Sequence, residues 1–196
     1  MSGFDRQRYE EAQSVYAGAD CLIPADEIGA AYDRMADAVT ADLAELDPVV
    51  ICVMLGGLQA TAELGKRLHF PFELDYLHAT RYRGETSGGE LVWKVSPGLR
   101  LADRHVLIVD DILDEGHTLA AILAAIKAQG AASVRTAMLL LKDHDRRANG
   151  VHADYVGCHV ADRYVFGAGM DYKGYYRQLP GVWAIGQPGT SGEGAA

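Results

Sequence analysis

Residues 105–130 read HVLIVDDILDEGHTLAAILAAIKAQG, and this stretch decides the fold. Residues 106–109 form a short apolar run rich in β-branched side chains, which predicts a strand buried on both faces, as in a parallel sheet packed between helices. Apolar residues between 119 and 126 then recur at i, i+3, i+4 and i+7, and Gly130 follows where a helix cap would lie. The pattern therefore predicts a strand, a loop and a helix.

The loop between this strand and helix, residues 110–118, sets four carboxylates and one glycine on a turn. Backbone N–H groups at such a turn, together with the helix N-terminus, can bind a phosphate. The loop lacks the Gly-Lys-Ser/Thr ending of a Walker motif, and carboxylates repel phosphate unless they also hold sugar hydroxyls or magnesium. The pattern favours a sugar phosphate over a nucleotide triphosphate. The alternative is an acidic, solvated turn at the edge of a sheet.

Residues 106–118, VLIVDDILDEGHT, resemble the phosphoribosyl-diphosphate (PRPP) binding motif of the type I phosphoribosyltransferases. Alternating strand and helix units, together with this resemblance, predict an α/β fold with a twisted, mainly parallel sheet of about five strands flanked by helices. A small hood is expected over the carboxyl ends of the strands. We expect one domain over residues 1–186, with its core at about 25–145, a hood from about 150–186 that includes part of the N-terminal segment, and a disordered tail at 187–196.

Charge and cysteine content exclude several classes of protein. The net charge of −9 argues against a protein that coats nucleic acid. Three scattered cysteines fit a reduced compartment and argue against a disulfide scaffold or a thiolate zinc site. No apolar run approaches the ~20 residues that cross a bilayer, and the polar start does not resemble a signal peptide. We therefore expect a cytoplasmic protein that binds neither membrane nor nucleic acid.

A second strand, glycine turn and helix precede the first such unit. Residues 49–54 predict a buried strand, Gly56 and Gly57 a turn, and 59–68 a helix, so a second anion site is plausible at that helix N-terminus. A Gly-Gly pair is weak evidence by itself. In the resembled family this turn is the pyrophosphate loop and often carries a cis peptide. Relatives commonly have a polar or basic residue where Leu55 stands, so we expect Leu55 to contribute only through its backbone.

Three further segments have a clear pattern. Apolar residues from Ile28 to Leu46 predict a long amphipathic helix, and the alternation within 70–79 predicts a half-exposed strand. Residues 80–90 are polar and glycine-rich, which indicates either a lid that excludes water or a flexible hairpin tip. The resembled family has a mobile catalytic loop there, and its tyrosine matches Tyr82.

Lys142 follows the next predicted buried strand, residues 132–141. A lysine at the carboxyl end of a parallel strand faces the crevice in which such sheets bind ligands, although a solvated strand end is the alternative. An ammonium only donates hydrogen bonds, so it would complement the O6 acceptor of a 6-oxopurine and oppose the amino group of adenine. We therefore expect Lys142 to select the base.

Residues 154–185 are dense in aromatic residues and glycine, and part of this density could serve core packing. The order of residues 162–165 and 171–177 resembles the base-binding hood of hypoxanthine-guanine phosphoribosyltransferases, which implies a purine substrate. Ala168 departs from the pattern, because relatives usually carry an aromatic residue there.

The resemblance implies transfer of the 5-phosphoribosyl group from PRPP to N9 of hypoxanthine or guanine, giving IMP or GMP and pyrophosphate. Mg²⁺ is the implied cofactor, and the assembly implied is a homodimer or homotetramer. Two alternatives stay open: a PRPP-sensing regulator with little turnover, and a phosphoribosyltransferase for xanthine or a pyrimidine. Asp114 is the candidate general base, with a pKa raised by burial, or else an acid placed at a helix N-terminus.

The remaining roles are also implied by the resemblance. Asp110 and Asp111 would bind the ribose hydroxyls and Mg²⁺, and Asp171 a second Mg²⁺. The 5-phosphate would be bound by Asp114, Glu115, Gly116, His117 and Thr118, and the pyrophosphate by Leu55, Gly56, Gly57 and Arg177. The purine would be bound by Lys142, Tyr164, Val165 and Asp171, and the catalytic residues would be Asp114 and Tyr82.

Overall fold

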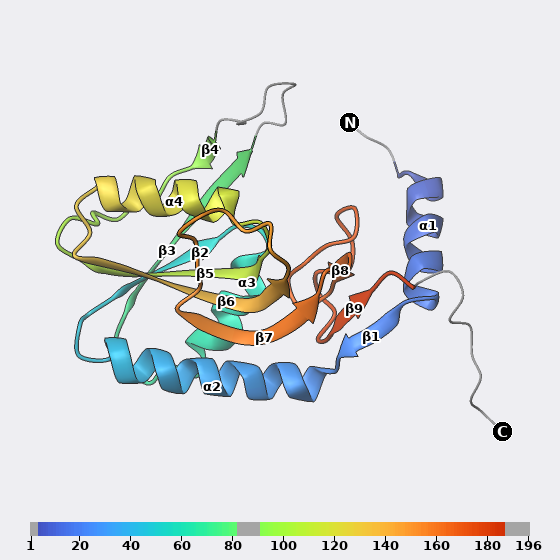
Figure 1. The fold of residues 1–196 in the computed structure, drawn as a ribbon, viewed down its shortest axis with the longest axis horizontal. Coiled ribbons are helices and arrows are strands. Elements are labelled where there is room, and N and C mark those ends of the chain that lie inside the picture. Colours follow the sequence, from blue (N-terminus) through green and yellow to red (C-terminus); the bar gives the residue numbers. More distant parts are fainter. Residues whose placement is uncertain (1–3, 82–90, 187–196) are drawn as a thin grey trace.

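The computed structural model describes residues 4–81 and 91–186. They form a large sheet between two layers of helices and a small sheet at one end (Figure 1). The helices are α1 (Arg6–Ala17), α2 (Ala25–Leu43), α3 (Gly57–Gly65) and α4 (His117–Ala128). The strands are β1 (Asp20–Ile23), β2 (Val49–Val53), β3 (Glu73–Arg81), β4 (Leu91–Val95), β5 (His105–Leu113), β6 (Ser133–Asp143), β7 (Tyr155–Ala161), β8 (Val165–Phe166) and β9 (Val182–Ala184).

The large sheet has the strand order β4-β3-β2-β5-β6-β7. Its five strands from β3 to β7 in that order are parallel, and β4 pairs antiparallel at the edge. Helix α4 covers one face, and α2 and α3 cover the other (Figure 1). The predicted α/β class with a mainly parallel sheet is therefore confirmed.

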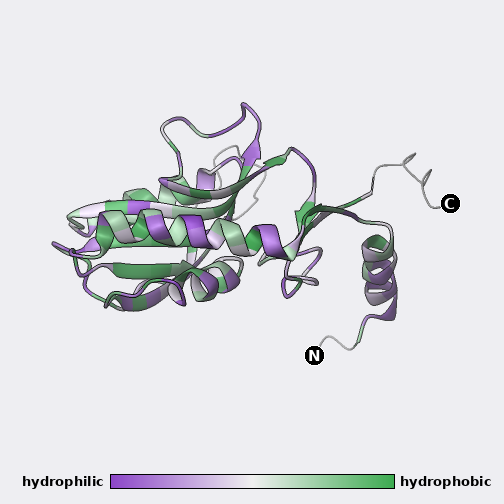
Figure 2. Ribbon diagram, turned by 90° about the horizontal axis from the view of Figure 1, so that it is seen from below, coloured by the Kyte–Doolittle hydropathy of each residue, from purple (hydrophilic) through white to green (hydrophobic). Residues whose placement is uncertain are grey.

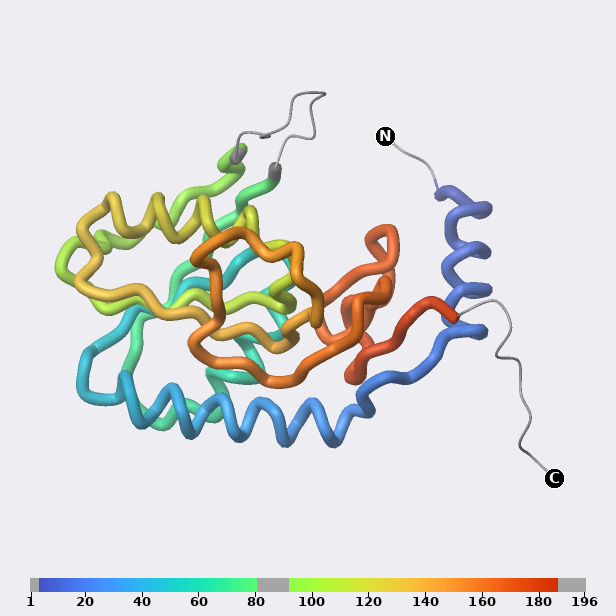
Figure 3. Tube along the Cα trace, viewed as in Figure 1, coloured from blue at the N-terminus to red at the C-terminus, as the bar shows by residue number. Residues whose placement is uncertain are grey.

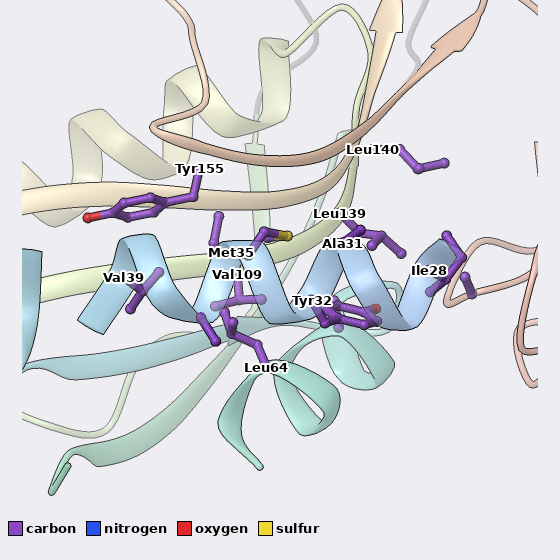
Figure 4. Packing of buried hydrophobic residues seen from close by; sticks show 14 of the residues in the cluster. Ile28, Ala31, Tyr32, Met35, Val39, Leu64, Val109, Leu139, Leu140 and Tyr155 are labelled. Carbon is purple, nitrogen blue, oxygen red and sulfur yellow. The ribbon is translucent and has the colours of Figure 1, made fainter. Parts of the chain in front are cut away.

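Each face of the sheet has its own core cluster because parallel strands are apolar on both sides. On α2 the side chains that face the sheet include Tyr32, Met35 and Val39, none more than 2% exposed (Figure 4). Hydrophobic and hydrophilic bands alternate along this helix (Figure 2). The predicted amphipathic helix is confirmed, and it ends at Leu43, before the expected boundary.

The small sheet has the order β1-β9-β8 and forms the hood. The hood and α1 lie together at one end of the molecule (Figure 3). Phe166 and Tyr172 pack with Ala12 of α1 in a third apolar cluster. Strand β7 belongs to the large sheet, so β8 and β9, the last two strands of the small sheet, come from residues after 164. The division into a core at about 25–145 and a hood from about 150–186 stays a prediction.

Two local expectations need correction, and one helix was not predicted. Strand β5 continues through Asp110 and Asp111 to Leu113, because its backbone stays paired with β6 as far as Leu141, so only the last part of the acidic segment is a turn. Helix α1 had no sequence signal, since Ala12 is its only buried residue. On β3 the apolar residues Leu74 and Tyr76 of the alternating pattern lie on the exposed side, at 62% and 45% exposure, whereas Leu77 and Ala79 face the core.

Within the described residues, none of the helices has the combination of length and hydropathy that a membrane span requires. Predictions for Tyr82, the 82–90 part of the lid and the tail at 187–196 concern residues outside the described ranges.

Candidate active site

The candidate site lies where the carboxyl ends of β2, β5 and β6 meet. Parallel strands bring the turn at 54–57, the segment 110–118 and residues 142–144 to the same edge of the sheet. The hood approaches this edge, because a side chain at Gly169 would meet the carbonyl oxygen of Gly56 at 2.5 Å. The fold therefore gathers sequence-distant polar residues at one place.

Asp110, which is half-buried, and Asp111, which is buried, form a pair of carboxylates near the end of β5. Asp111 is only 8% exposed, and its backbone N–H donates to Asp110 Oδ1 at 2.9 Å. Burial, and then the charge of Asp111, raise the pKa of Asp110 well above its usual value. Burial also raises the pKa of Asp111, although the hydrogen bonds that it accepts and the charge of Arg177 oppose this. Two adjacent acids whose pKa values are both raised favour a bound cation.

The Gly56-Gly57 pair is required by close packing against these acids. A Cβ atom at Gly57 would lie 2.5 Å from the carbonyl oxygen of Val109, and one at Gly56 would overlap the carboxylate of Asp111. The peptide bond between Met54 and Leu55 is cis. Among the described residues, no protein acceptor is hydrogen-bonded to the N–H groups of residues 55–57. These amides are therefore available to an anion.

The turn before α4 is also open to an anion. Gly116 has φ +76°, a left-handed conformation that favours glycine, and α4 begins directly after it. Across the described part of the chain, the N–H groups of residues 114–118 find no protein acceptor. Glu115 accepts from the Ala148 amide through its carbonyl oxygen, which anchors the turn without using its donors. These open donors support the phosphate site expected from the sequence, which stays a prediction.

Asp114 is held by two donors on opposite oxygens. Lys142 Nζ lies 2.7 Å from Asp114 Oδ2, and His144 Nε2 lies 2.6 Å from Oδ1. Burial would raise the pKa of Asp114, but the hydrogen bonds from Lys142 and His144 outweigh it and lower that pKa. The expectation that the pKa of Asp114 is raised is therefore wrong for this state of the site.

The hood adds a second charged group beside the paired acids. Arg177 Nη1 donates to the carbonyl oxygen of Gly169 at 2.6 Å and lies 3.8 Å from Asp111 Oδ2. Its Nη2 pairs with the carboxylate of Asp171, which also accepts from the Gly174 amide at 2.6 Å. The structure therefore brings Arg177, Asp171 and Asp111 together. Asp111 and Asp171 are 60 positions apart in the sequence.

Two other predicted purine contacts have contrasting environments. Tyr164 is 52% exposed, and its hydroxyl donates to the carbonyl oxygen of Asp171 at 3.2 Å, so one end of the ring is held while the ring itself stays accessible. Val165 is buried in β8 and can offer only its backbone.

Ala168 stands where relatives usually carry an aromatic residue. It is fully buried with φ 49°, and it donates its N–H to the Leu179 carbonyl at 2.8 Å.

Magnesium fits this donor set only with help from a ligand. In residues 4–81 and 91–186, no three His, Cys, Asp or Glu side chains converge as a complete metal cage. Mg²⁺ commonly keeps several waters and takes one or two carboxylates together with phosphate oxygens. The adjacent carboxylates of Asp110 and Asp111 suit this manner of binding.

One contact was missed by sequence reasoning. The His144 side chain is 3% exposed and touches Asp114, yet the sequence analysis gave it no role. The available signal was its spacing, because His144 comes two positions after Lys142 at the carboxyl end of the same strand.

Comparison with known proteins identifies the family. A family model described as phosphoribosyl transferase domain matches residues 24–173. The chain belongs to the phosphoribosyltransferase family.

Within this family the chain is similar to hypoxanthine-guanine phosphoribosyltransferases. It is 35% identical to the hypoxanthine-guanine phosphoribosyltransferase of Streptococcus pneumoniae over 165 residues, which cover 84% of this chain and 91% of the relative. It is 34% identical to the hypoxanthine-guanine-xanthine phosphoribosyltransferase of Tritrichomonas foetus over 155 residues, 79% of this chain and 85% of the relative. A solved hypoxanthine phosphoribosyltransferase from Staphylococcus aureus matches with a TM-score of 0.83 at 26% identity, over 92% of this chain and 98% of that one.

Proposed function

We propose that this protein transfers the 5-phosphoribosyl group of PRPP to N9 of hypoxanthine or guanine, releasing pyrophosphate and giving IMP or GMP. The observation that carries the proposal is the adjacent pair of half-buried Asp110 and buried Asp111, next to the amides of 114–118 that have no protein acceptor among the described residues. A ribose with hydroxyls and a 5-phosphate satisfies both groups at once, since carboxylates accept from hydroxyls and amides donate to phosphate.

Charge separation in the reaction explains the remaining donors. When the anomeric C–O bond breaks, positive charge develops on the ribose and negative charge on the pyrophosphate. Asp110 and Asp111 would hold the ribose hydroxyls and Mg²⁺, and Asp171 would serve a second Mg²⁺ through water. Bound magnesium supplies Lewis-acid neutralisation of the leaving pyrophosphate. The amides of Leu55, Gly56 and Gly57, with Arg177, would donate to the same anion.

The base would be read by Lys142, Tyr164 and Val165. Lys142 would leave Asp114 and donate to O6 of the purine, Tyr164 would stack on the ring, and the Val165 backbone would meet its Watson–Crick edge. Asp114 would then accept the N7 proton as N9 attacks. Tyr82 would contribute from the lid.

One assay tests the activity and the choice of base. The full-length protein is incubated with PRPP, Mg²⁺ and hypoxanthine, guanine, xanthine or a pyrimidine in turn, and pyrophosphate release is followed. Release with hypoxanthine or guanine supports the proposal. Release only with xanthine or a pyrimidine would overturn the base assignment. Binding of PRPP without release for any base would replace the enzyme with a PRPP sensor.

A further inference from the structure

His144 is a buried polar side chain that the proposed reaction does not use. It follows the last residue of β6, and its side chain is 3% exposed. Its Nε2 lies 2.6 Å from Asp114 Oδ1, while the backbone N–H of Arg146 donates to its Nδ1 at 3.1 Å. Both ring nitrogens are therefore occupied by protein partners.

These partners determine where the ring proton lies. A backbone amide can only donate, so Nδ1 must accept and cannot carry a proton in this arrangement. The proton of the neutral ring is therefore on Nε2, which donates to Asp114 without any need for a charged imidazole. The ring behaves as a fixed hydrogen-bond donor.

The other donor to Asp114 can leave. Lys142 Nζ lies 2.7 Å from Asp114 Oδ2 and also 3.8 Å from Asp162 Oδ1, so the ammonium has a second anionic partner when it turns toward a ligand. A lysine also reorients through several rotatable bonds, whereas the ring of His144 is held at both nitrogens. Departure of Lys142 would free Oδ2 and leave Oδ1 engaged.

We propose that His144 is a positioning residue that holds Asp114 Oδ1, so that Oδ2 is the oxygen presented to the purine. The proposal rests on the proposed function. When Asp114 accepts the N7 proton, that proton must go to Oδ2, because Oδ1 already faces the Nε2–H of His144. The bond from N7 to the proton breaks as the bond to Oδ2 forms, and the electron pair of N–H stays in the purine ring.

The charged groups around this contact come from several segments. Lys142 approaches from β6, Glu115 from the turn before α4, and Asp162 from the segment after β7. Arg146 pairs with Asp162 at 2.7 Å and lies 3.9 Å from Glu115. None of these ion pairs includes His144, so a change in the pH profile after its replacement reports the loss of one donor to Asp114.

Two substitutions separate the donor from the shape of the ring. His144→Phe keeps an aromatic ring and removes the donor, whereas His144→Gln keeps an N–H group at a similar reach. A carboxylate that loses a donor gains a proton at higher pH, so in His144→Phe the acid limb of kcat/KM for hypoxanthine should move to higher pH by about one unit, with on the order of a tenfold loss below that limb. His144→Gln should restore most of the parent profile, and KM for PRPP should stay within about twofold.

His159→Gln is the matched control, since His159 of β7 makes an exposed contact with Asp143, the last residue of β6, at 2.8 Å. Its pH profile should equal that of the parent. Thermal melting establishes that each variant is folded. If His144→Phe does not fold, His144→Gln carries the test. An acid limb of His144→Gln that lies about one pH unit above that of the parent, as expected for loss of the donor, is then evidence against the proposal. A folded His144→Phe with the parent profile overturns it. A parent that releases no pyrophosphate with any base instead overturns the proposed function.

Discussion

The turn around Gly57 and the carboxylate of Asp114 lie at the same edge of the sheet, yet they are built differently. At Gly57 the backbone packs against the backbone of β5 so closely that a Cβ atom there would lie 2.5 Å from the Val109 carbonyl oxygen. At Asp114 the structure depends on side-chain donors, Lys142 and His144. The first region tolerates no added atom, whereas the second can exchange partners.

This difference separates two tasks. A rigid turn can keep its amides aimed at an anion without rearrangement, which is how preorganised donors stabilise developing charge. In the proposed reaction, Lys142 would leave Asp114 when a base with a matching acceptor binds. Substitutions should therefore act on the two regions through different measurements.

The largest effect is expected at the packed turn. Gly57→Ala should cost about 1–3 kcal/mol of unfolding free energy, because the neighbouring atoms are backbone and cannot rotate away. Displacement of the turn should lower kcat/KM by about a hundredfold. Urea unfolding and pyrophosphate release measure the two effects. Gly29→Ala in α2 is the control, because a Cβ atom at Gly29 would meet no neighbouring group within 4 Å. It should stabilise the fold by about 0.5–1 kcal/mol. Equal behaviour of the two variants would show that the packing at Gly57 has no consequence.

Next in size is Lys142→Ala, which acts on the exchangeable side. Loss of a hydrogen bond from a charged donor should lower kcat/KM for hypoxanthine roughly 10- to 100-fold, with PRPP affinity changed far less. Steady-state kinetics and calorimetric titration with PRPP separate the two quantities. Lys127→Ala, at an exposed position late in α4, is the control. Equal hypoxanthine turnover in Lys142→Ala and the parent would remove the assignment of Lys142 to the base.

A smaller effect is expected for Arg177→Met, which removes the donor next to the paired acids. We expect KM for PRPP to rise about tenfold, since charge-assisted hydrogen bonds to the anion are lost. Arg34→Met is a matched control, because Arg34 also donates to a glycine carbonyl, that of Gly157, at 3.1 Å. If both variants keep the KM of the parent, Arg177 has no part in binding the pyrophosphate.

The smallest effect is expected for Leu55→Asn. The Leu55 side chain is 54% exposed, so only its backbone should contribute to the turn. Turnover should stay within about threefold of the parent and unfolding free energy within about 0.5 kcal/mol. A tenfold change in either direction would show that the side chain itself meets a ligand.

The sequence was sufficient for the class of fold, because strand and helix patterns are local. Residues 106–109 and the apolar spacing of α2 and α4 each report burial within one segment, and all three elements were found. The acidic order of 110–118 similarly indicated a sugar phosphate. Helix α1 was not found because Ala12 is its one buried residue, and its other contacts to the hood come from partly exposed side chains such as Tyr16, which leave no clear apolar period.

The sequence by itself determined a mainly parallel α/β sheet, and it led to the hypothesis that the acidic segment 110–118 binds a sugar phosphate. Only the tertiary structure decided that Gly57 is a glycine because Val109 lies against it, and that the pKa of Asp114 is lowered. The physical reason is that steric exclusion and electrostatics act between atoms close in space. The partners of Asp114, Lys142 and His144, are 28 and 30 positions away along the chain.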